Sequence, residues 1–293
     1  MDTFVLVGIG EILWDELPHS RRLGGAPANF AIHGSRLGGQ GLVISAVGAD
    51  GRGEEIRRVL ADENVASHLV TDQHHPTGRV TVALDDKGGA EYTICKDVAW
   101  DYLPFEPLFP GLARRTDAVC FGTLAQRSTL TATTIRRFIE ATGKDCLRFF
   151  DINLRASYYS AEIIAQLLEL ATHFKCNEEE FEIISTMFLS EDGETGKLRE
   201  LRSLFSLQMI VLTKGGAGSR LFAGVEKDSQ RMPEPCTIVD TIGAGDSFTA
   251  AVAIGVLSGL NLEKIHLHAG RVAARVCSFP GATPPGKSYS GDI

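Results

Sequence analysis

Short apolar runs rich in β-branched residues alternate with longer segments of helical spacing along most of the chain. The expected strands are residues 3–8, 42–48, 118–122, 147–151 and 209–213. The expected helices are residues 28–37, 131–141 and 161–170. Repeated strand–helix–strand units of this kind predict an α/β fold with a mostly parallel central sheet and helices on both faces, a three-layer sandwich.

One segment breaks this order. Residues 77–94 alternate apolar and polar positions around the turn D85-D-K-G-G89, which predicts a β-hairpin. The stretch at 14–22 is equally irregular. We therefore expect a small β-sheet lid, built from about 12–24 and 75–104, within one domain that spans 1–293, because no Pro/Gly/Ser-rich linker divides the chain.

Composition narrows the classes of function. The 29 Lys and Arg residues are outnumbered by 37 Asp and Glu residues, the net charge is −8, and no long basic run occurs. Binding to nucleic acid or to a membrane surface therefore has little electrostatic support, and a small-molecule ligand is favoured. The six cysteines are scattered, which favours reduced thiols, and the N-terminal apolar run is too short for a secretory signal, so we expect a cytoplasmic protein.

The C-terminal string G281-A-T-P-P-G-K-S288 matches the pattern of a nucleotide phosphate loop. A working loop lies between a strand and a helix, whose N-terminus supplies aligned N–H donors. Too few residues follow Lys287 to form a helix, and two prolines lack N–H groups. We expect no phosphate contact from Lys287.

A better anion site lies at T237-I-V-D-T-I-G-A-G-D-S-F248. Here 237–239 reads as a short strand, and a helical pattern begins near Gly243. The backbone N–H groups of Gly243, Ala244 and Gly245 can approach a phosphoryl oxygen closely, because these residues have little or no side chain. The segment therefore predicts an anion hole, although a plain helix start is also consistent with these residues.

Asp246 follows in the first helical turn, where the helix dipole should favour its ionised form. A carboxylate beside a phosphate site would repel the phosphate, which is unfavourable unless it takes part in the chemistry. We expect Asp246 to act as a general base that accepts the proton of an acceptor hydroxyl.

The string D240-T-I-G-A-G-D-S-F resembles the C-terminal signature of the PfkB, or ribokinase-like, carbohydrate kinases. G24-G-A-P-A-N-F-A-I-H-G-S-R-L-G-G39 and G10-E-I-L-W-D15 are similar to N-terminal motifs of the same family. The resemblance implies a ribokinase-like sandwich with Asp246 as the base. By the same resemblance, the residues that bind sugar are Asp15, Gly24, Gly25 and Asn29.

Two further motifs resemble those with which the family binds its nucleotide. C176-N-E-E-E180 is similar to an N-x-x-E motif, which implies that Asn177 and Glu180 organise Mg²⁺ and phosphate, with Glu180 acting through water. L212-T-K-G-G-A-G-S219 implies ATP contacts from Thr213, Gly215 and Gly218. The stretch 268–284 matches the part of the family that contacts adenine.

Family members often bind a monovalent cation beside the anion hole. By resemblance, the carboxylate of Asp240 would be a ligand of K⁺, together with loop carbonyls near Ser278 and Gly281. The alternative is that Asp240 caps the helix that follows.

The substrate signals point first to D-fructose, phosphorylated at a primary hydroxyl. G-G-A-P-A-N, Y92-T-I, V98-A-W-D and D151-I-N-L-R are fructokinase-like. The D-x-N-x-R element also resembles that of 2-keto-3-deoxygluconate kinases. Arg155 would meet a substrate carboxylate or phosphate, or would pair with an acid at the strand end. Ribokinase, a nucleoside kinase and a non-catalytic sugar- and ATP-sensing protein stay open.

Two aromatic residues and the assembly state complete the expectations. Tyr92 and Trp100 would either stack on a sugar or pack in a core or dimer contact. The hairpin has one face to bury, which is compatible with a homodimer through the lid.

Overall fold

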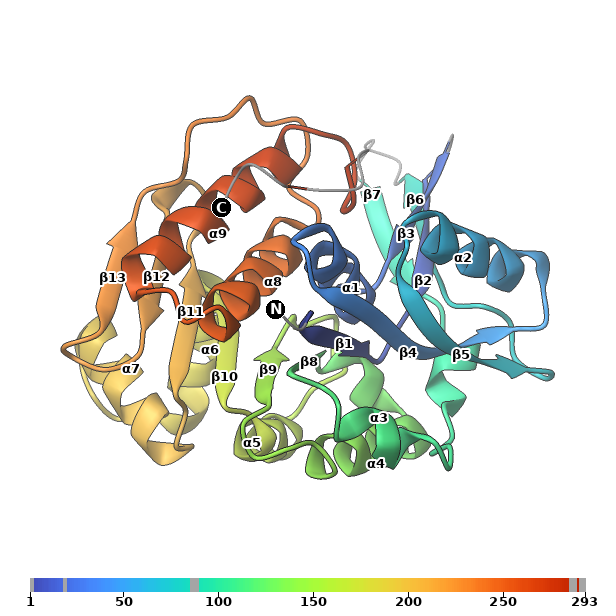
Figure 1. Ribbon diagram of the computed structural model, residues 1–293, viewed down its shortest axis with the longest axis horizontal. Coiled ribbons are helices and arrows are strands. Elements are labelled where there is room, and N and C mark those ends of the chain that lie inside the picture. Colours follow the sequence, from blue (N-terminus) through green and yellow to red (C-terminus); the bar gives the residue numbers. More distant parts are fainter. Residues whose placement is uncertain (1–2, 18–19, 85–89, 285–288, 290–293) are drawn as a thin grey trace.

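The computed structural model describes residues 3–17, 20–84, 90–284 and 289. Within them, a large sheet runs from edge to edge in the order β13-β12-β11-β10-β9-β8-β1-β4-β5 (Figure 1). The bounds in that order are β13 (Asp228–Arg231), β12 (Ser219–Phe222), β11 (Met209–Thr213), β10 (His173–Asn177), β9 (Leu147–Asp151), β8 (Ala118–Phe121), β1 (Val5–Ile9), β4 (Gln40–Gly48) and β5 (Ala66–Asp72). All neighbours pair in parallel except β12, which is antiparallel to both β11 and β13.

Helices cover both faces of this sheet, as the alternation of strands and helices predicted. One face carries α1 (Ala26–Arg36), α2 (Gly51–Asp62), α8 (Ala244–Leu257) and α9 (Leu262–Cys277). The other carries α3 (Phe109–Ala113), α4 (Thr129–Glu140), α5 (Ala161–Leu170), α6 (Glu178–Phe188) and α7 (Gly193–Leu204). Short 3₁₀ helices lie at η1 (Ala99–Tyr102), η2 (Leu124–Arg127) and η3 (Gly215–Ala217).

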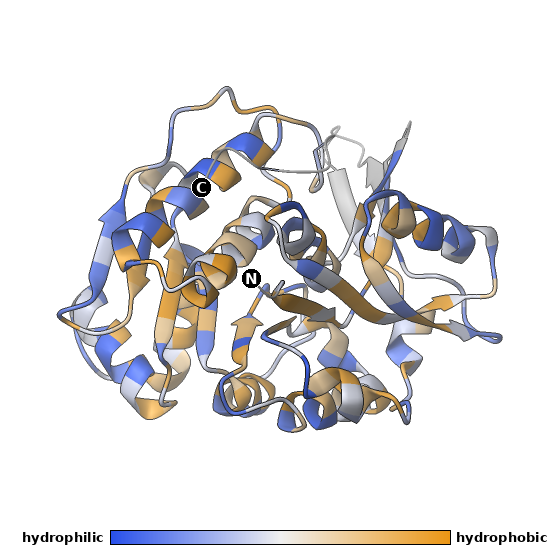
Figure 2. Cartoon of the chain, viewed as in Figure 1, coloured by the Kyte–Doolittle hydropathy of each residue, from blue (hydrophilic) through white to orange (hydrophobic). Residues whose placement is uncertain are grey.

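Strand alternation separates the two hydrophobic layers. In β1, Val7 and Ile9 pack into the core on the α3–α7 side, whereas Leu6 packs beside Phe30 of α1. Hydropathy follows this arrangement: the central strands are largely hydrophobic, and the outer helices carry hydrophilic residues on their outward sides (Figure 2). Burial on both faces explains why these strands read as continuous apolar runs.

A second, small sheet stands beside the large one (Figure 1). Its order is β3-β2-β6-β7, with bounds β3 (Ser20–Gly24), β2 (Leu13–Leu17), β6 (Arg79–Leu84) and β7 (Ala90–Ile94). β6 and β7 form the predicted antiparallel hairpin, and the predicted turn at 85–89 lies outside the described residues. β2 pairs in parallel with β6, so two segments far apart in the sequence build this sheet together.

One predicted element is wrong. Residues 237–239 form no strand, although β9, α5 and β11 have their predicted bounds. The N–H of Val239 donates to the carbonyl of Cys277 at the end of α9, and no strand of the described chain lies beside it. The side chains of Ile238 and Val239 are exposed, so the apolar run that predicted a short strand faces solvent.

No helix in the described ranges is long and apolar enough to span a membrane.

Candidate active site

A cavity of about 830 Å³ opens at the carboxyl ends of β1, β9, β10 and β11, the edge where parallel α/β sheets place their ligands. The small sheet contributes to one wall and the start of α8 to another. The predicted site residues on its walls are Asp15, Gly24, Gly25, Asn29, Arg155, Asn177, Thr213, Gly215, Gly218, Gly243, Ala244, Gly245 and Asp246. Glu180 and Asp240 are absent from the described residues that line it.

The predicted anion hole lies at the N-terminus of α8. Gly243 is the residue before the helix and has a left-handed backbone, with φ of 78°. A Cβ there would stand 2.5 Å from Cα of Ala282, so only glycine allows this close approach. The first-turn N–H groups of α8, which have no partner within the helix, lie at the cavity wall.

The carboxylate of Asp246 accepts a hydrogen bond of 2.7 Å from the side-chain amide of Asn29 in α1. Burial raises the pKa of Asp246 to about 6, and the nearby carboxylate of Asp151 adds to the increase, while Asn29 and Lys175 oppose it. The sequence suggested that the helix dipole would favour the ionised form; desolvation outweighs it. A carboxyl with this pKa is a better proton acceptor at neutral pH than an ordinary aspartate.

Glu11 is a second acid of the cavity, which the sequence reasoning left unassigned. Its side chain is 4% exposed, and its Oε2 has no hydrogen-bond partner among the described residues. Burial raises the pKa of Glu11 to about 7, and the charge of Asp246 contributes. A charged residue two positions after a buried strand, in G10-E-I-L-W-D, was the signal that could have identified it.

The wall expected to bind sugar brings together Asp15, Gly24 and Arg155. A Cβ at Gly24 would stand 2.5 Å from Oδ2 of Asp15, so this glycine leaves space for the carboxylate. Burial raises the pKa of Asp15, and the positive charges of Arg155 and Arg22 moderate the increase. The charge of Arg155 also lowers the pKa of Glu11 and Asp246, so it affects every acid of this wall.

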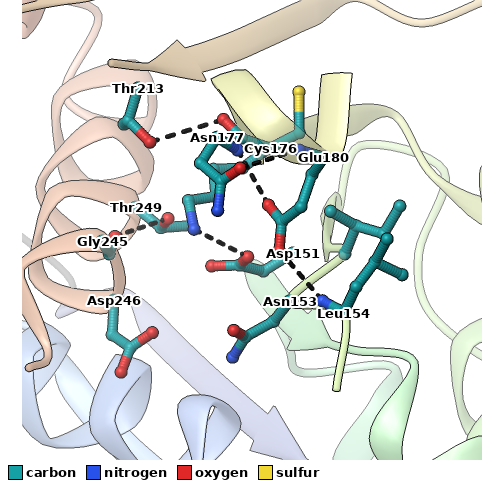
Figure 3. A network of polar contacts seen from close by, with 12 residues as sticks. Asp151, Asn153, Leu154, Cys176, Asn177, Glu180, Thr213, Gly245, Asp246 and Thr249 are labelled. Carbon is teal, nitrogen blue, oxygen red and sulfur yellow. Dashed lines mark hydrogen bonds and ion pairs between the residues drawn. The ribbon is translucent and has the colours of Figure 1, made fainter. Parts of the chain in front are cut away.

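Behind Asp246 lies a buried ion pair that the sequence analysis missed. Nζ of Lys175 in β10 donates to Oδ1 of Asp151 at 2.9 Å, and both side chains are nearly inaccessible. Asp151 ends β9 and points toward the start of α8 (Figure 3). A Cβ at Gly245 would stand 2.9 Å from Lys175 Nζ, which places the ammonium directly beside the predicted anion hole. A lysine inside the apolar strand H173-F-K-C-N was the available signal.

The N-x-x-E residues form a reciprocal cap on α6. Oδ1 of Asn177 accepts from the N–H of Glu180, and Oε2 of Glu180 accepts from the N–H of Asn177, each at 2.8 Å (Figure 3). Oε1 of Glu180 accepts from the N–H of Leu154 at 2.9 Å. Glu180 thus joins the loop after β9 to the start of α6, and Asn177 reaches the cavity.

The far end of the cavity is formed by Thr213 at the end of β11 and by Gly215 and Gly218 in the turn that follows. Gly218 has a φ of 99°, and a Cβ there would stand 2.1 Å from the carbonyl oxygen of Arg231. Two exposed apolar side chains, Met232 and Ile238, also line this end. A flat apolar ring system could cover them.

Three further expectations concern residues at the edges of the site. Trp100 is fully buried beneath the stacked guanidinium of Arg127 and is absent from the described cavity lining, so the structure favours its core role. The side chain of Tyr92 and all of Lys287 lie outside the described residues.

Among the described residues, the hydrogen bonds to the Asp240 carboxylate all come from N–H groups. Its carboxylate accepts from Arg22 and from the N–H groups of Ile242 and Gly281. This donor set does not fit the expected role of Asp240 as a cation ligand.

Comparison with known proteins identifies the family. The model of the pfkB family carbohydrate kinases matches residues 19–288. The chain belongs to the PfkB family of carbohydrate kinases.

Relatives of this PfkB carbohydrate kinase cover nearly its whole length. The fructokinase of Salmonella typhimurium is 30% identical in an alignment of 294 positions that covers 95% of this chain and 93% of that protein. Mouse ribokinase is 25% identical and covers 86% of this chain and 77% of its own length. The structure of a sugar kinase from Pyrococcus horikoshii in complex with ATP has a TM-score of 0.82, with 28% identity, 96% of this chain and 95% of that chain covered. The predicted ribokinase-like fold is confirmed.

Proposed function

We propose that this carbohydrate kinase transfers the γ-phosphoryl group of ATP to a primary hydroxyl of D-fructose, giving fructose 6-phosphate. The observation that carries the proposal is the contact between Asn29 and Asp246. It joins a residue of the sugar wall to a carboxyl group that has the pKa of a general base and lies at the anion hole.

In the proposed reaction, Asp246 takes the proton of the acceptor hydroxyl as that oxygen attacks phosphorus in line. The N–H groups of Gly243, Ala244 and Gly245 stabilise the charge on the transferred group, and the ammonium of Lys175 lies close to them. The proton leaves the sugar oxygen for the carboxylate, the bond to the β-phosphate oxygen breaks, and ADP departs.

The nucleotide would occupy the end of the cavity formed by Thr213, Gly215 and Gly218. The Pyrococcus horikoshii relative is known in complex with ATP, which supports ATP as the phosphoryl donor. The residues around Asn177 fit Mg²⁺ held through water. Asn177 lies on the cavity wall, and Glu180 is buried behind it, where each of its oxygens accepts one N–H, so Glu180 would act through Asn177 and water rather than as a direct ligand. The ion would neutralise phosphate charge during transfer.

Fructose is favoured as the substrate because the fructokinase of Salmonella typhimurium matches nearly all of this chain. Asp15 and Asn29 supply the carboxylate and amide groups that can pair with sugar hydroxyls. Oδ1 of Asn29 is buried with no partner among the described residues, so a sugar hydroxyl can donate to it. Ribokinase stays an alternative, since mouse ribokinase also matches.

A specific observation supports an acid sugar, such as 2-keto-3-deoxygluconate, as second candidate. Arg155 is exposed at the cavity wall, and its guanidinium donates only to the carbonyl of Leu154 among the described contacts. A substrate carboxylate would find a planar pair of donors there.

The small sheet would act as a lid that excludes water, because water in the closed site would be phosphorylated in place of sugar. The homodimer expected through this sheet stays a prediction.

The test is magnesium-dependent ADP release from ATP with fructose, ribose, 2-keto-3-deoxygluconate, glucose and adenosine. We expect a large preference for fructose. Asp246→Asn should lower kcat by about 10²–10⁴, the usual contribution of a general base, with little change in ATP binding. Undiminished turnover in that variant would contradict the mechanism.

The panel also separates the alternatives. Preference for the acid sugar, removed in Arg155→Gln, would support the second candidate. Binding of sugar and ATP without any ADP release would favour a sensing protein, and turnover with adenosine would favour a nucleoside kinase.

A further inference from the structure

We propose that Arg22 provides the positive charge that a monovalent cation would otherwise bring to Asp240, so that this kinase needs no potassium. The proposal concerns the region behind the anion hole. Its activity test rests on the proposed phosphoryl transfer, and a second test does not.

Arg22 reaches Asp240 from the small sheet. Its Nη1 donates to Oδ2 of Asp240 at 2.9 Å. The stem of Arg22 lies across Gly281, where a Cβ would stand 2.8 Å from Cδ of Arg22. Gly281 has a φ of 83° and no side chain, so the loop after α9 leaves room for the arginine.

The remaining lone pairs of Asp240 are largely occupied. Oδ1 accepts from the N–H of Ile242 at 3.0 Å, and Oδ2 also accepts from the N–H of Gly281 at 2.8 Å. Burial alone would raise the pKa of Asp240, but these two N–H groups and the guanidinium lower it, so the carboxylate is ionised. A cation bound to the same carboxylate would lie beside a fixed positive charge, and the donor N–H groups would point toward it.

The ion pair of Arg22 and Asp240 holds the anion hole in place. Asp240 starts the turn that leads to Gly243, and Gly243 packs on Ala282, the neighbour of Gly281. Through its two oxygens, Asp240 therefore joins the turn before α8 to the loop after α9, and Arg22 neutralises the charge of that junction. Arg22 is a positioning residue here, since it is absent from the described cavity lining.

The position of Arg22 also relates this junction to the sugar wall. In the antiparallel pair of β2 and β3, Arg22 is directly opposite Asp15, and its charge lowers the pKa of that acid. One guanidinium thus lies between the residue expected to bind sugar and the turn that forms the anion hole.

The first experiment compares ADP release in buffers whose only monovalent cation is potassium, sodium or tetramethylammonium, at equal ionic strength. We expect kcat of the natural protein to agree within twofold in all three. Stimulation of fivefold or more by potassium would overturn the proposal without any variant.

Variants then test the arginine itself. Arg22→Gln should lose roughly tenfold in kcat without potassium, because a small displacement of the phosphate-binding turn is costly, and potassium should restore much of it. Arg22→Lys keeps the charge and should stay insensitive to potassium. The matched control is Arg21→Gln, the neighbouring lid arginine, which pairs with Glu55 instead. Equal potassium responses in Arg22→Gln and Arg21→Gln would overturn the proposal.

A second readout does not depend on the acceptor. ATP should raise the thermal unfolding temperature of the natural protein equally with potassium or tetramethylammonium, but that of Arg22→Gln more with potassium. If no sugar is phosphorylated, the proposed function fails while this comparison still decides the role of Arg22. If ATP raises the unfolding temperature of the natural protein more with potassium than with tetramethylammonium, the proposed role of Arg22 is wrong.

Discussion

Asn29 and Asp246 share a hydrogen bond of 2.7 Å although 217 positions separate them in the sequence. The bond joins the first turn of α1 to the first turn of α8. It orients the carboxyl group and leaves Oδ1 of Asn29 for a ligand hydroxyl. One amide therefore contacts the proposed base and keeps an acceptor oxygen for the hydroxyl group whose proton that base would take.

The pH dependence of the reaction should report Asp246. With a pKa of about 6, the ionised base is lost as pH falls, so kcat/KM should fall about tenfold per unit well below that value and level off near pH 7. Asp151→Asn removes a negative neighbour, so the acid limb should move to lower pH. A limb that stays in place in that variant would contradict the assignment of the base.

Gly24→Ala should weaken sugar binding selectively. The added methyl group would lie 2.5 Å from Oδ2 of Asp15 and displace that carboxylate. We expect KM for the sugar to rise about tenfold or more, as for the loss of one strong hydrogen bond, while KM for ATP changes little. Gly111→Ala is the matched control, because no atom lies within 4 Å of its added Cβ. Equal effects of the two substitutions on sugar KM would contradict the placement of Asp15.

Glu11→Gln should change how stability depends on pH. An acid whose pKa is raised from 4.5 to about 7 by folding favours the folded state at low pH, and this stability is lost as pH rises between the two values. The ionised Glu11 thus costs on the order of 3 kcal/mol at pH 8. Glu11→Gln should therefore raise the unfolding temperature at pH 8 and leave it nearly unchanged at pH 4. A uniform effect across pH would exclude a buried, titrating Glu11.

Lys175→Met should be strongly destabilising. It leaves the carboxylate of Asp151 buried without its partner, and breaking a buried pair in this way typically costs about 3–5 kcal/mol. The double variant Lys175→Met with Asp151→Leu should recover much of the loss in denaturant unfolding. Additive losses in the double variant would show that the two charges do not compensate each other.

Much of the fold could be predicted because local pattern and tertiary environment agree. Strand β11 is buried on both faces, so its apolar run M209-I-V-L-T marks its bounds. The strand predicted at T237-I-V is wrong because a run of apolar residues does not show whether a partner strand is present. Regular structure is predictable where packing repeats along the chain, and less so where one loop meets another.

The candidate site shows the same division. Residues within one contiguous motif, from Gly243 to Asp246, could be placed together from the sequence, because helix geometry relates them. Lys175 with Asp151, and Arg22 with Asp240, come from segments whose meeting depends on strand order and on the position of the small sheet. The spacing of residues along the sequence does not predict such contacts.

The carboxylate of Glu180 accepts from Leu154, next to Arg155 on the wall expected to bind sugar, and from Asn177, on the side expected to bind nucleotide. A single side chain thereby links the backbone segments of the two halves of the cavity. Occupancy of either half should order the backbone that the other half requires, which makes donor and acceptor affinities cooperative and, by linkage, reciprocal. Such heterotropic coupling would favour a ternary complex over either binary complex.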